Sequence, residues 1–409
     1  MTRIDSSPGV SLYPNPRAAP AQQPYEAGCA RPLSQQGFAQ AWAEISQWPG
    51  YEATALVELP ALAHSLGLGS VYYKDEHRRF ALKSFKALGG AYAVFRLIQQ
   101  AVVDQYGVSA PSAQALLSGK YDDVVRRLTV TCATDGNHGR SVAWGAQMFG
   151  CQCVIYVHSQ VSQSRADAIA AFGACVDRVA GNYDDSVRHA AQQAHKHGWH
   201  VVSDTTYEGY RDIPIDVMHG YGVMAREIID VFGHEPPTHV IVQAGVGAFA
   251  ASVCASFWLA WKAKRPRFVV VEPKAADCLF QSAMASRLVA VPGELETVMA
   301  GLACGEVSPV AWEILADGAN DFARIDDDFA LQGMRRLAQP APGDVAVVSG
   351  ETGAAGLGLL LAVQDQRDLR QALGLDQHSR VLLLGSEGDT DPAIYREVVG
   401  QSAEQVLAV

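Results

Sequence analysis

The stretch LTVTCATDGNHGRSVAWGAQM, residues 128–148, decides the fold class of this chain. Its apolar run ends at Ala133, a glycine-containing turn follows, and a helical pattern starts near Asn137. A turn between a buried strand and a helix points successive backbone amides at whatever binds above it, which suits an anion such as a carboxylate. Asp135 stands among these amides and would repel an anion, so it has either a chemical role or a structural one. The structural alternative is that Asp135 caps the helix.

The composition is that of a globular protein that acts on small molecules. The chain has 409 residues, 49% of them hydrophobic, which is enough for a large core and two domains. Its 32 basic and 43 acidic residues give a net charge of -11 without a basic stripe, so we expect no nucleic-acid partner. There is no charged-then-apolar leader and no apolar stretch of about twenty residues that would span a bilayer. The sequence therefore predicts a cytoplasmic protein without membrane contact.

The cysteine pattern does not predict a metal site. Cys151 and Cys153 form a CxC inside an apolar run rather than a zinc-binding pair, and most cysteines are expected to be small buried hydrophobic residues. Cys278 and Cys304 lie in predicted loops near the expected active site. Free thiols are the expectation for these two in the cytoplasm, and a disulfide between them is the alternative. The eight cysteines are Cys29, Cys132, Cys151, Cys153, Cys175, Cys254, Cys278 and Cys304.

From Ser70 onward, short β-branched runs alternate with amphipathic helical stretches, which predicts parallel strands joined by crossover helices. The fold class is therefore α/β, with two domains that each hold a mostly parallel twisted sheet flanked by helices. Ligands of such sheets bind at the carboxyl ends of the strands. The expected strands are residues 71–73, 128–133, 151–157, 175–179, 200–203, 239–243, 267–272, 344–349 and 380–386. The expected helices are residues 84–100, 137–148, 163–172, 183–197, 215–231, 247–264 and 353–366.

The domain seams are expected near Gly89 and Pro214. The large domain would begin with residues 1–88 and resume at residues 215–409, and the small domain would hold residues 89–214. The N-terminal segment is rich in Pro, Ser and Ala, and its composition predicts an extended chain on the surface.

Lys86 lies in the stretch FALKSFKALGGAYAV, residues 80–94, at the start of a predicted helix. A cation is oddly placed there, because the positive end of the helix dipole repels it. An ordinary surface lysine is the alternative. An amine held beside that dipole end and apolar walls loses proton affinity, as a lysine that forms a Schiff base must. Gly89 and Gly90 would allow another part of the backbone to come close.

A second glycine-containing turn occurs in HVIVQAGVGAFAASV, residues 239–253, between a buried strand and a helix. Its amides would bind an anion at the helix N-terminus, most naturally a phosphate. The alternative is a dinucleotide fingerprint, in which Glu272 would be the ribose-binding acid of an NAD-dependent dehydrogenase. That alternative leaves Lys86 and the turn at residues 134–140 without a role. The expected phosphate-binding residues are Ala244, Gly245, Val246, Gly247 and Ala248.

Three motifs in one order resemble the fold-type-II pyridoxal-phosphate enzymes, the group that includes threonine synthase and the serine and threonine dehydratases. They are SFK at residues 84–86, GNHG at residues 136–139 and the loop at residues 244–249. The resemblance extends from Ser70 to Pro392. It implies a bound pyridoxal 5'-phosphate and identifies the loop as its phosphate site.

The resemblance also implies roles for individual residues. Lys86 would bind the cofactor covalently, and Asn137 would contact the phenolic oxygen of its ring. The stretch LLLGSEGDTDP, residues 382–392, would lie beside the pyridine nitrogen. Ser386 is the candidate partner of that nitrogen, with the neighbouring positions 385 and 387 as alternatives in register.

Asp135 departs from the commonest pattern of this family, in which a serine stands at this position. An acid followed by GNHGR resembles the diaminopropionate ammonia-lyase subfamily, and residues 74–93, 182–188, 203–214 and 386–392 agree with it. The resemblance implies a homodimeric lyase. It would eliminate ammonia from D- and L-2,3-diaminopropionate and yield pyruvate and two ammonia. A dehydratase or β-replacement enzyme for serine-like substrates is the alternative.

Elimination from both enantiomers requires two bases, because their α-hydrogens lie on opposite faces of the bound substrate. The resemblance implies that Asp135 serves the D-isomer and Asp204 the L-isomer. Asp184 and Asp185 are rival candidates, but their position predicts helix capping instead. Lys86 is the candidate donor of a proton to the departing amine. The expected substrate-binding residues are Thr134, Asp135, Gly136 and His138.

Overall fold

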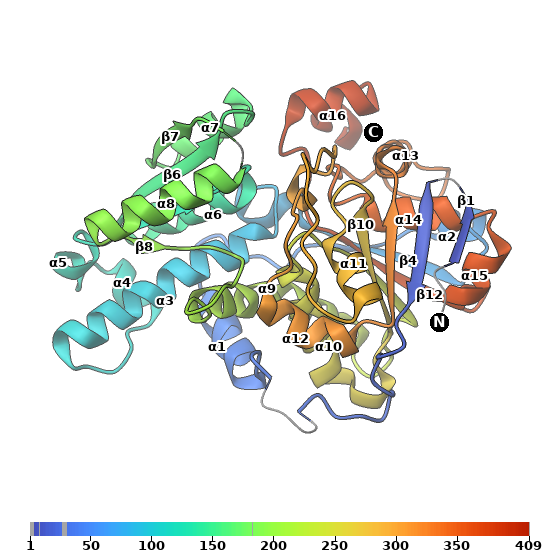
Figure 1. Ribbon diagram of the computed structural model, residues 1–409, viewed down its shortest axis with the longest axis horizontal. Coiled ribbons are helices and arrows are strands. Elements are labelled where there is room, and N and C mark those ends of the chain that lie inside the picture. The colour runs from blue at the N-terminus through green and yellow to red at the C-terminus, as the bar shows by residue number, and fades with distance from the viewer. Residues whose placement is uncertain (1–3, 8, 27–30, 182, 409) are drawn as a thin grey trace. The chain divides into compact units, whose positions relative to one another are not determined.

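A computed structural model describes residues 4–7, 9–26, 31–181 and 183–408 (Figure 1). The chain folds into two compact units, and each unit holds one sheet. The first unit comprises residues 1–32, 53–78 and 224–409, and the second comprises residues 33–52 and 79–223.

The sheet of the first unit has eight strands in the order β1-β2-β11-β10-β9-β12-β4-β3. The strands from β11 to β4 are parallel, whereas β1, β2 and β3 pair antiparallel at the two ends. Its central strands β9, β10 and β12 are buried along nearly their whole length, as expected for parallel strands that helices cover on both faces. The bounds are β1 Ile4–Ser7, β2 Val10–Pro14, β3 Leu56–Glu58, β4 Ser70–Asp75, β9 His239–Gln243, β10 Arg267–Pro273, β11 Asp321–Ile325 and β12 Arg380–Gly385.

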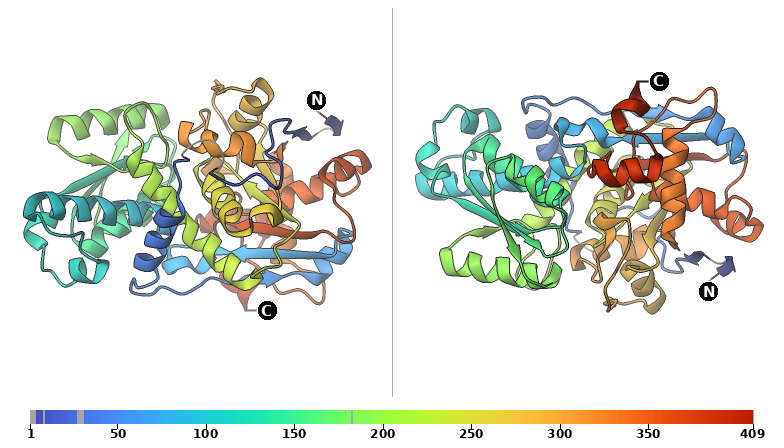
Figure 2. Two further views of the ribbon diagram at one scale, coloured as in Figure 1. Left: turned by 90° about the horizontal axis from the view of Figure 1, so that it is seen from below. Right: turned by 90° about the horizontal axis from the view of Figure 1, so that it is seen from above.

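The core of the first unit lies between this sheet and its flanking helices, where Val71, Ile241 and Leu383 are almost fully buried. The C-terminal α16 and α17 pack with α13 around a smaller cluster that includes Tyr395 and Met334 (Figure 2). The helices are α2 Pro60–Ser65, α10 Ala248–Trp261, α11 Cys278–Ala285, α12 Pro309–Gly318, α13 Asp327–Ala338, α14 Ala355–Val363, α15 Arg367–Leu373, α16 Pro392–Val399 and α17 Ala403–Leu407. Short 3-10 helices occupy Lys262–Lys264 and Ala300–Leu302.

The sheet of the second unit has four parallel strands in the order β7-β6-β5-β8, and α6 and α8 pack on β5 and β6. The strands are β5 Thr129–Ala133, β6 Gln152–His158, β7 Cys175–Val179 and β8 His200–Val201. The helices are α1 Gln35–Ile45, α3 Lys86–Tyr106, α4 Ala113–Leu117, α5 Asp122–Val125, α6 Asn137–Phe149, α7 Gln163–Ala170 and α8 Tyr183–His197. The 3-10 helix Glu76–Ala81 and α9 Asp212–Phe232 each continue from one unit into the other.

The predicted α/β class is confirmed, and every predicted strand but one is present. Residues 344–349 form no strand, because their backbone bonds to other partners. The Val347 amide donates to the Leu337 carbonyl at 2.9 Å, at the end of α13. Conversely, β2 lies in the N-terminal segment that composition predicted to be a surface chain. Its Val10 and Leu12 are buried, and it pairs with β11.

The division into units differs from the predicted domain bounds in two respects. The seams follow residues 78 and 223, so Lys86 belongs to the second unit. Residues 33–52 also belong to the second unit, because Trp48 packs on the rings of Phe95 and Phe149.

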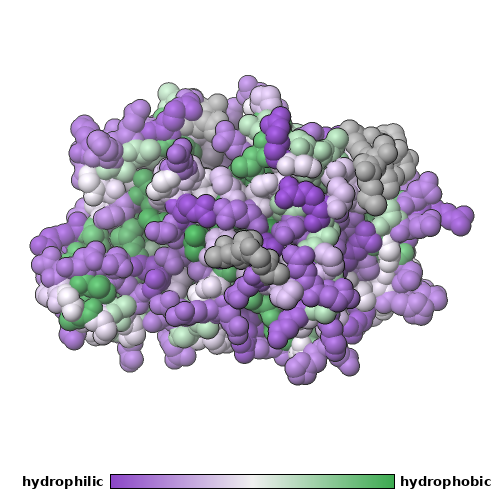
Figure 3. Space-filling model, turned by 60° about the horizontal axis from the view of Figure 1, so that its bottom comes forward, coloured by the Kyte–Doolittle hydropathy of each residue, from purple (hydrophilic) through white to green (hydrophobic). Residues whose placement is uncertain are grey.

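No helix of the described residues is both long and apolar enough to cross a membrane. Figure 3 shows one face of the molecule, on which hydrophilic residues predominate and apolar residues form small separate groups.

Candidate active site

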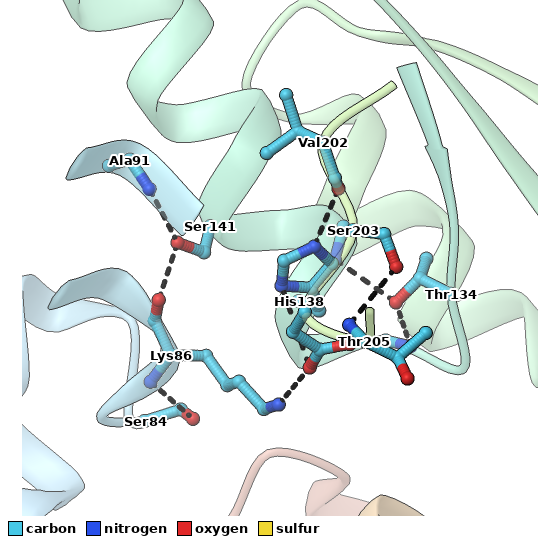
Figure 4. Close-up of polar contacts among 12 residues, drawn as sticks. Ser84, Lys86, Ala91, Thr134, His138, Ser141, Val202, Ser203 and Thr205 are labelled. Carbon is cyan, nitrogen blue, oxygen red and sulfur yellow. Dashed lines mark hydrogen bonds and ion pairs between the residues drawn. The ribbon is translucent and has the colours of Figure 1, made fainter. Parts of the chain in front are cut away.

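Lys86 and Asp204 form an ion pair in the second unit. The close-up labels Lys86 and draws the polar contacts around it as dashed lines (Figure 4). Lys86 is the first residue of α3, and its Nζ donates a hydrogen bond to Asp204 Oδ2. The side chains are 20% and 15% exposed, respectively. Asp204 follows β8 in a turn that Tyr210 holds. The Tyr210 hydroxyl donates to the Val201 carbonyl and accepts from the Ser203 amide, both at 2.9 Å.

The pKa of Lys86 in this pair differs from the pKa that the sequence led us to expect. Burial by itself lowers the pKa of Lys86, but Asp204 and Tyr221 outweigh it and hold that pKa above its ordinary value. Burial likewise raises the pKa of Asp204, and Lys86 and His138 hold it below its usual range. The predicted loss of proton affinity at Lys86 is therefore wrong for this arrangement, because the prediction took no account of a carboxylate from a distant segment.

Tyr221 of α9 also lies beside Lys86. The Lys86 Nζ stands 5.6 Å from the centroid of its ring, and that ring packs on Phe85 at 4.6 Å. This approach requires Gly89, since a Cβ there would lie 2.3 Å from Tyr221 Cε1. The backbone approach expected at Gly89 is confirmed by Gly220 of α9, where a Cβ would lie 3.0 Å from Gly89 Cα. Tyr221 was not predicted as a site residue, although glycines on both of its sides in a long helix indicate close packing.

His138 faces the same pair from α6. Its Nε2 donates to the Val202 carbonyl at 2.8 Å, and its Nδ1 lies 3.8 Å from Asp204 Oδ2. Burial lowers the pKa of His138, and the Lys86 charge acts in the same direction, while Asp204 opposes them. Because His138 Nε2 donates to the Val202 carbonyl, the ring carries a proton on that nitrogen. Among the described residues, its Nδ1 has no hydrogen-bond partner.

Ser141 joins the start of α3 to α6. Its hydroxyl donates to the Lys86 carbonyl at 2.6 Å and accepts from the Ala91 amide at 3.1 Å. The helix that carries His138 is thereby fixed to the helix that carries Lys86, which keeps the two side chains in register.

Asp135 does not cap α6. The residue before that helix is Gly136, which has no side chain to cap it. Thr134 binds the amides of this turn instead. Its Oγ1 accepts from the amides of Gly136 and Gly139, both at 3.0 Å. Asp135 Oδ1 accepts from His158 Nε2 at 2.8 Å. The capping alternative is therefore wrong, and the turn has fewer free amides than its sequence predicts.

The glycine loop of the first unit keeps the geometry of an anion site. Gly247 precedes α10 with a φ of 94°, and no side chain caps the helix. A residue with a Cβ is strained in this conformation, and its Cβ would lie 3.2 Å from that of Ala311. No side-chain cap therefore competes with a phosphate at the start of α10.

Ser386 lies at the carboxyl end of β12 and is buried. Gln243, at the end of the adjacent β9, donates from Nε2 to Ser386 Oγ at 2.7 Å. Because Ser386 Oγ accepts this bond, its own proton is left to donate. Of the alternatives in register, Gly385 has no side chain and Glu387 accepts from the Thr352 amide at 3.1 Å. Sequence reasoning missed Gln243, whose contact arises only when β9 and β12 pair.

These donors fit pyridoxal phosphate. Taken singly, Lys86 is an amine, the glycine loop precedes a helix that no side chain caps, and Ser386 is a buried hydroxyl. An amine, an anion site and a hydroxyl match the aldehyde, phosphate and ring nitrogen of that cofactor. The described residues hold no cluster of three His, Cys, Asp or Glu side chains suited to a metal ion.

The dehydrogenase alternative is not supported by Glu272. Its two carboxylate oxygens accept from the amides of Leu279 and Phe280 at 2.8 and 2.7 Å, and the side chain is fully buried. Burial raises the pKa of Glu272 well above its usual range. This acid therefore holds the start of α11 and is fully buried, away from a bound ribose.

The remaining candidate residues are the cysteines and two aspartates near the start of α8. Cys278 and Cys304 are free thiols, as are the other cysteines of the described residues, so the disulfide alternative is wrong for this structure. Cys29 lies outside the described residues. Asp185 accepts from Arg188 at 2.6 Å on the exposed surface of α8, and the Asp184 side chain is not among those described.

The Lys86–Asp204 pair predicts a pH-dependent stability of the cofactor-free protein. Asp204→Asn should lower the unfolding free energy by roughly 2–3 kcal/mol at pH 7, because Lys86 loses its partner in a mostly buried site. Asp204 has a lowered pKa, so its contribution is complete above the unfolded value of about 4 and is lost as the pH falls through the folded value. Urea unfolding of both proteins between pH 3 and 8 (about five points) measures the difference. A difference that does not shrink in acid would contradict this assignment.

Comparison with known proteins agrees with this site. The family model "Pyridoxal-phosphate dependent enzyme" matches residues 47–387. Diaminopropionate ammonia-lyase of Escherichia coli K12 is 41% identical over 362 residues, which cover 87% of this chain and 89% of the relative. The enzyme of the same name from Salmonella typhimurium LT2 is 41% identical over 366 residues, covering 87% and 90%.

A crystal structure of the Escherichia coli diaminopropionate ammonia-lyase in complex with D-serine superposes with a TM-score of 0.86. Its sequence identity is 37%, and the match covers 96% of this chain and 98% of that one. The predicted fold-type-II architecture and the predicted resemblance are confirmed. This chain belongs to the pyridoxal-phosphate dependent enzymes and, among them, to the diaminopropionate ammonia-lyase family.

Proposed function

We propose that this protein catalyses the pyridoxal-phosphate-dependent α,β-elimination of D- and L-2,3-diaminopropionate. One substrate molecule and one water give one pyruvate and two ammonia. The observation that carries the proposal is the carboxylate of Asp135 in a turn where it caps no helix. An acid at this place is suited to a substrate that carries a second ammonium group, and relatives that are 41% identical to this chain bear the name of that reaction.

Four parts of the chain would hold the cofactor. Lys86 Nζ would bind it covalently, Asn137 would contact the ring oxygen, Ser386 would donate to the ring nitrogen, and the amides of residues 244–248 would bind the phosphate. When bound, the cofactor supplies a sink for the electron pair that develops on the α-carbon. A hydroxyl partner leaves the ring nitrogen neutral, which favours elimination over transamination.

The phosphate loop makes a testable prediction. Gly247→Ala should weaken pyridoxal phosphate about tenfold, because a left-handed φ costs an alanine roughly 1–2 kcal/mol and distorts the amides. Titration of the cofactor-free protein by absorbance measures the affinity. Gly233→Ala is the matched control, since Gly233 also has a positive φ, in the same unit, with nothing near its Cβ. Equal affinities of the two variants would contradict the phosphate assignment.

The proton transfers follow from the contacts of the two aspartates. Lys86 Nζ gives a proton to the departing β-amine and is left as a neutral amine. For the L-isomer, Asp204 Oδ2 takes the α-proton and can then return it along its hydrogen bond to Lys86 Nζ. For the D-isomer, Asp135 takes the α-proton from the opposite face. Its side chain is 29% exposed, so this proton can exchange with water.

Substrate specificity tests the function against the dehydratase alternative. We expect kcat/KM for diaminopropionate to exceed that for serine by at least about 100-fold, because a carboxylate site favours an ammonium group over a hydroxyl. Pyruvate formation, followed by coupled reduction, gives both constants. A preference for serine or threonine would assign the chain to the dehydratases instead. A cytoplasmic location remains a prediction. So does a homodimer, which a measurement of the molecular mass in solution tests.

A further inference from the structure

Asp135 has a dedicated partner that its own motif does not reveal. His158, the last residue of β6, donates from Nε2 to Asp135 Oδ1 at 2.8 Å. The two side chains are 14% and 29% exposed, so both border solvent without being surface residues. Within the described chain, His158 is the one side chain recorded in a hydrogen bond with this carboxylate.

The tautomer of His158 is set by the backbone. The Gln160 amide donates to His158 Nδ1 at 3.3 Å. An Nδ1 that accepts a hydrogen bond carries no proton, so the proton of the neutral ring is on Nε2 and points at Asp135. The ring thus donates to one carboxylate oxygen and leaves Oδ2 without this bond.

Arg178 of β7 holds the loop that carries this imidazole. Its guanidinium donates to the carbonyls of His158, Ser159 and Val161 at 3.1, 3.2 and 2.7 Å. The Ser159 hydroxyl adds a bond to the Gly181 carbonyl at 2.8 Å. The loop after β6 is therefore anchored to the neighbouring strand, and the position of the ring is constrained from both sides.

The two aspartates have separate supports. Asp204 contacts Lys86 and faces His138, whereas Asp135 is held by His158. Loss of one histidine contact therefore changes one carboxylate and leaves the other in place.

We infer that His158 is a positioning residue for Asp135: it binds Oδ1 and so presents Oδ2 to the α-hydrogen of the D-isomer. The inference rests on the proposed function, in which Asp135 is the base for that isomer. Without His158 the carboxylate gains rotamer freedom and spends less time in the reactive orientation, which lowers kcat more than binding.

The test is the activity of His158→Leu and His158→Gln holoenzymes with each enantiomer. His158→Leu should lower kcat for the D-isomer about 10- to 100-fold, with KM and the L-isomer reaction changed less than about twofold. His158→Gln should restore the D-isomer reaction to within about threefold, because the glutamine amide donates from the position of Nε2. His189→Leu is the matched control: His189 packs on Tyr156 of the same strand at 4.9 Å, and both activities should persist.

Three results would overturn the inference. They are an unchanged D-isomer kcat in His158→Leu, an equal loss with both enantiomers, and a glutamine variant as slow as the leucine variant. Asp135→Asn, assayed in parallel, distinguishes a failure of the base assignment of Asp135 from a failure of the positioning role of His158. If Asp135→Asn loses the D-isomer reaction while His158→Leu keeps it, only the inference fails. If Asp135→Asn keeps the D-isomer reaction, the proposed base assignment fails and the inference with it.

Discussion

Lys86→Ala is expected to abolish turnover of both enantiomers, with a loss of at least about 1,000-fold. Lys86 is shared by the two reactions, since it would both attach the cofactor and give the proton to the departing amine. No other amine of the chain is recorded beside Asp204 in the described residues. Activity assays, together with the mass of the protein after borohydride reduction in the presence of pyridoxal phosphate, measure the loss and the missing attachment.

Two variants control this experiment. Lys86→Arg keeps a cation beside Asp204, so it should unfold like the wild type while remaining inactive, because a guanidinium stays protonated and does not attach the cofactor. Lys83→Arg makes the same change three residues earlier and should keep activity within about threefold. If Lys86→Ala retained more than about a hundredth of wild-type activity, the assignment of this lysine would be incorrect.

Asp135→Asn and Asp204→Asn are expected to have opposite enantiomer profiles. Asp135→Asn should lower kcat/KM for the D-isomer about 100- to 10,000-fold, because an amide cannot accept the α-proton. It should lower kcat/KM for the L-isomer less than about tenfold, through a weaker contact with the second ammonium group. Asp204→Asn should do the reverse. It should also slow the D-isomer reaction by less than about tenfold, since Lys86 loses its hydrogen-bond partner.

The separate contacts of the two aspartates underlie this crossed pattern. Asp135 is supported by His158, and Asp204 by Lys86 with His138 nearby. Initial rates with each pure enantiomer, for both variants and the wild type, measure it. Equal losses with both enantiomers in each variant would remove the two-base assignment while leaving the role of Lys86 intact.

The motifs that sequence predicted correctly are local ones. The strand, turn and helix around residues 128–148 and the loop at residues 244–248 are each set by a few consecutive residues, so patterning suffices. Whether Asp135 caps the helix could not be decided from these consecutive residues. Thr134, one residue earlier, offers the better acceptor for the Gly136 amide, and only the folded turn reveals that choice.

The contacts that sequence could not predict join distant segments. Asp204 meets Lys86 across 118 positions, and this contact reverses the expected direction of the pKa shift of Lys86. Gln243 meets Ser386 only because β9 and β12 are neighbours in the sheet. Residues 344–349 have the composition of a strand, but Val347 bonds to the end of α13, and β12 already has a strand on each side.

The stoichiometry of the wild-type reaction tests directly whether this chain eliminates ammonia from both enantiomers of 2,3-diaminopropionate. The holoenzyme would be incubated with D- and with L-2,3-diaminopropionate in turn, and pyruvate and ammonia would be quantified at completion. We expect both enantiomers to be consumed, with two ammonia released for each pyruvate. Consumption of one enantiomer alone, or of neither, would contradict it.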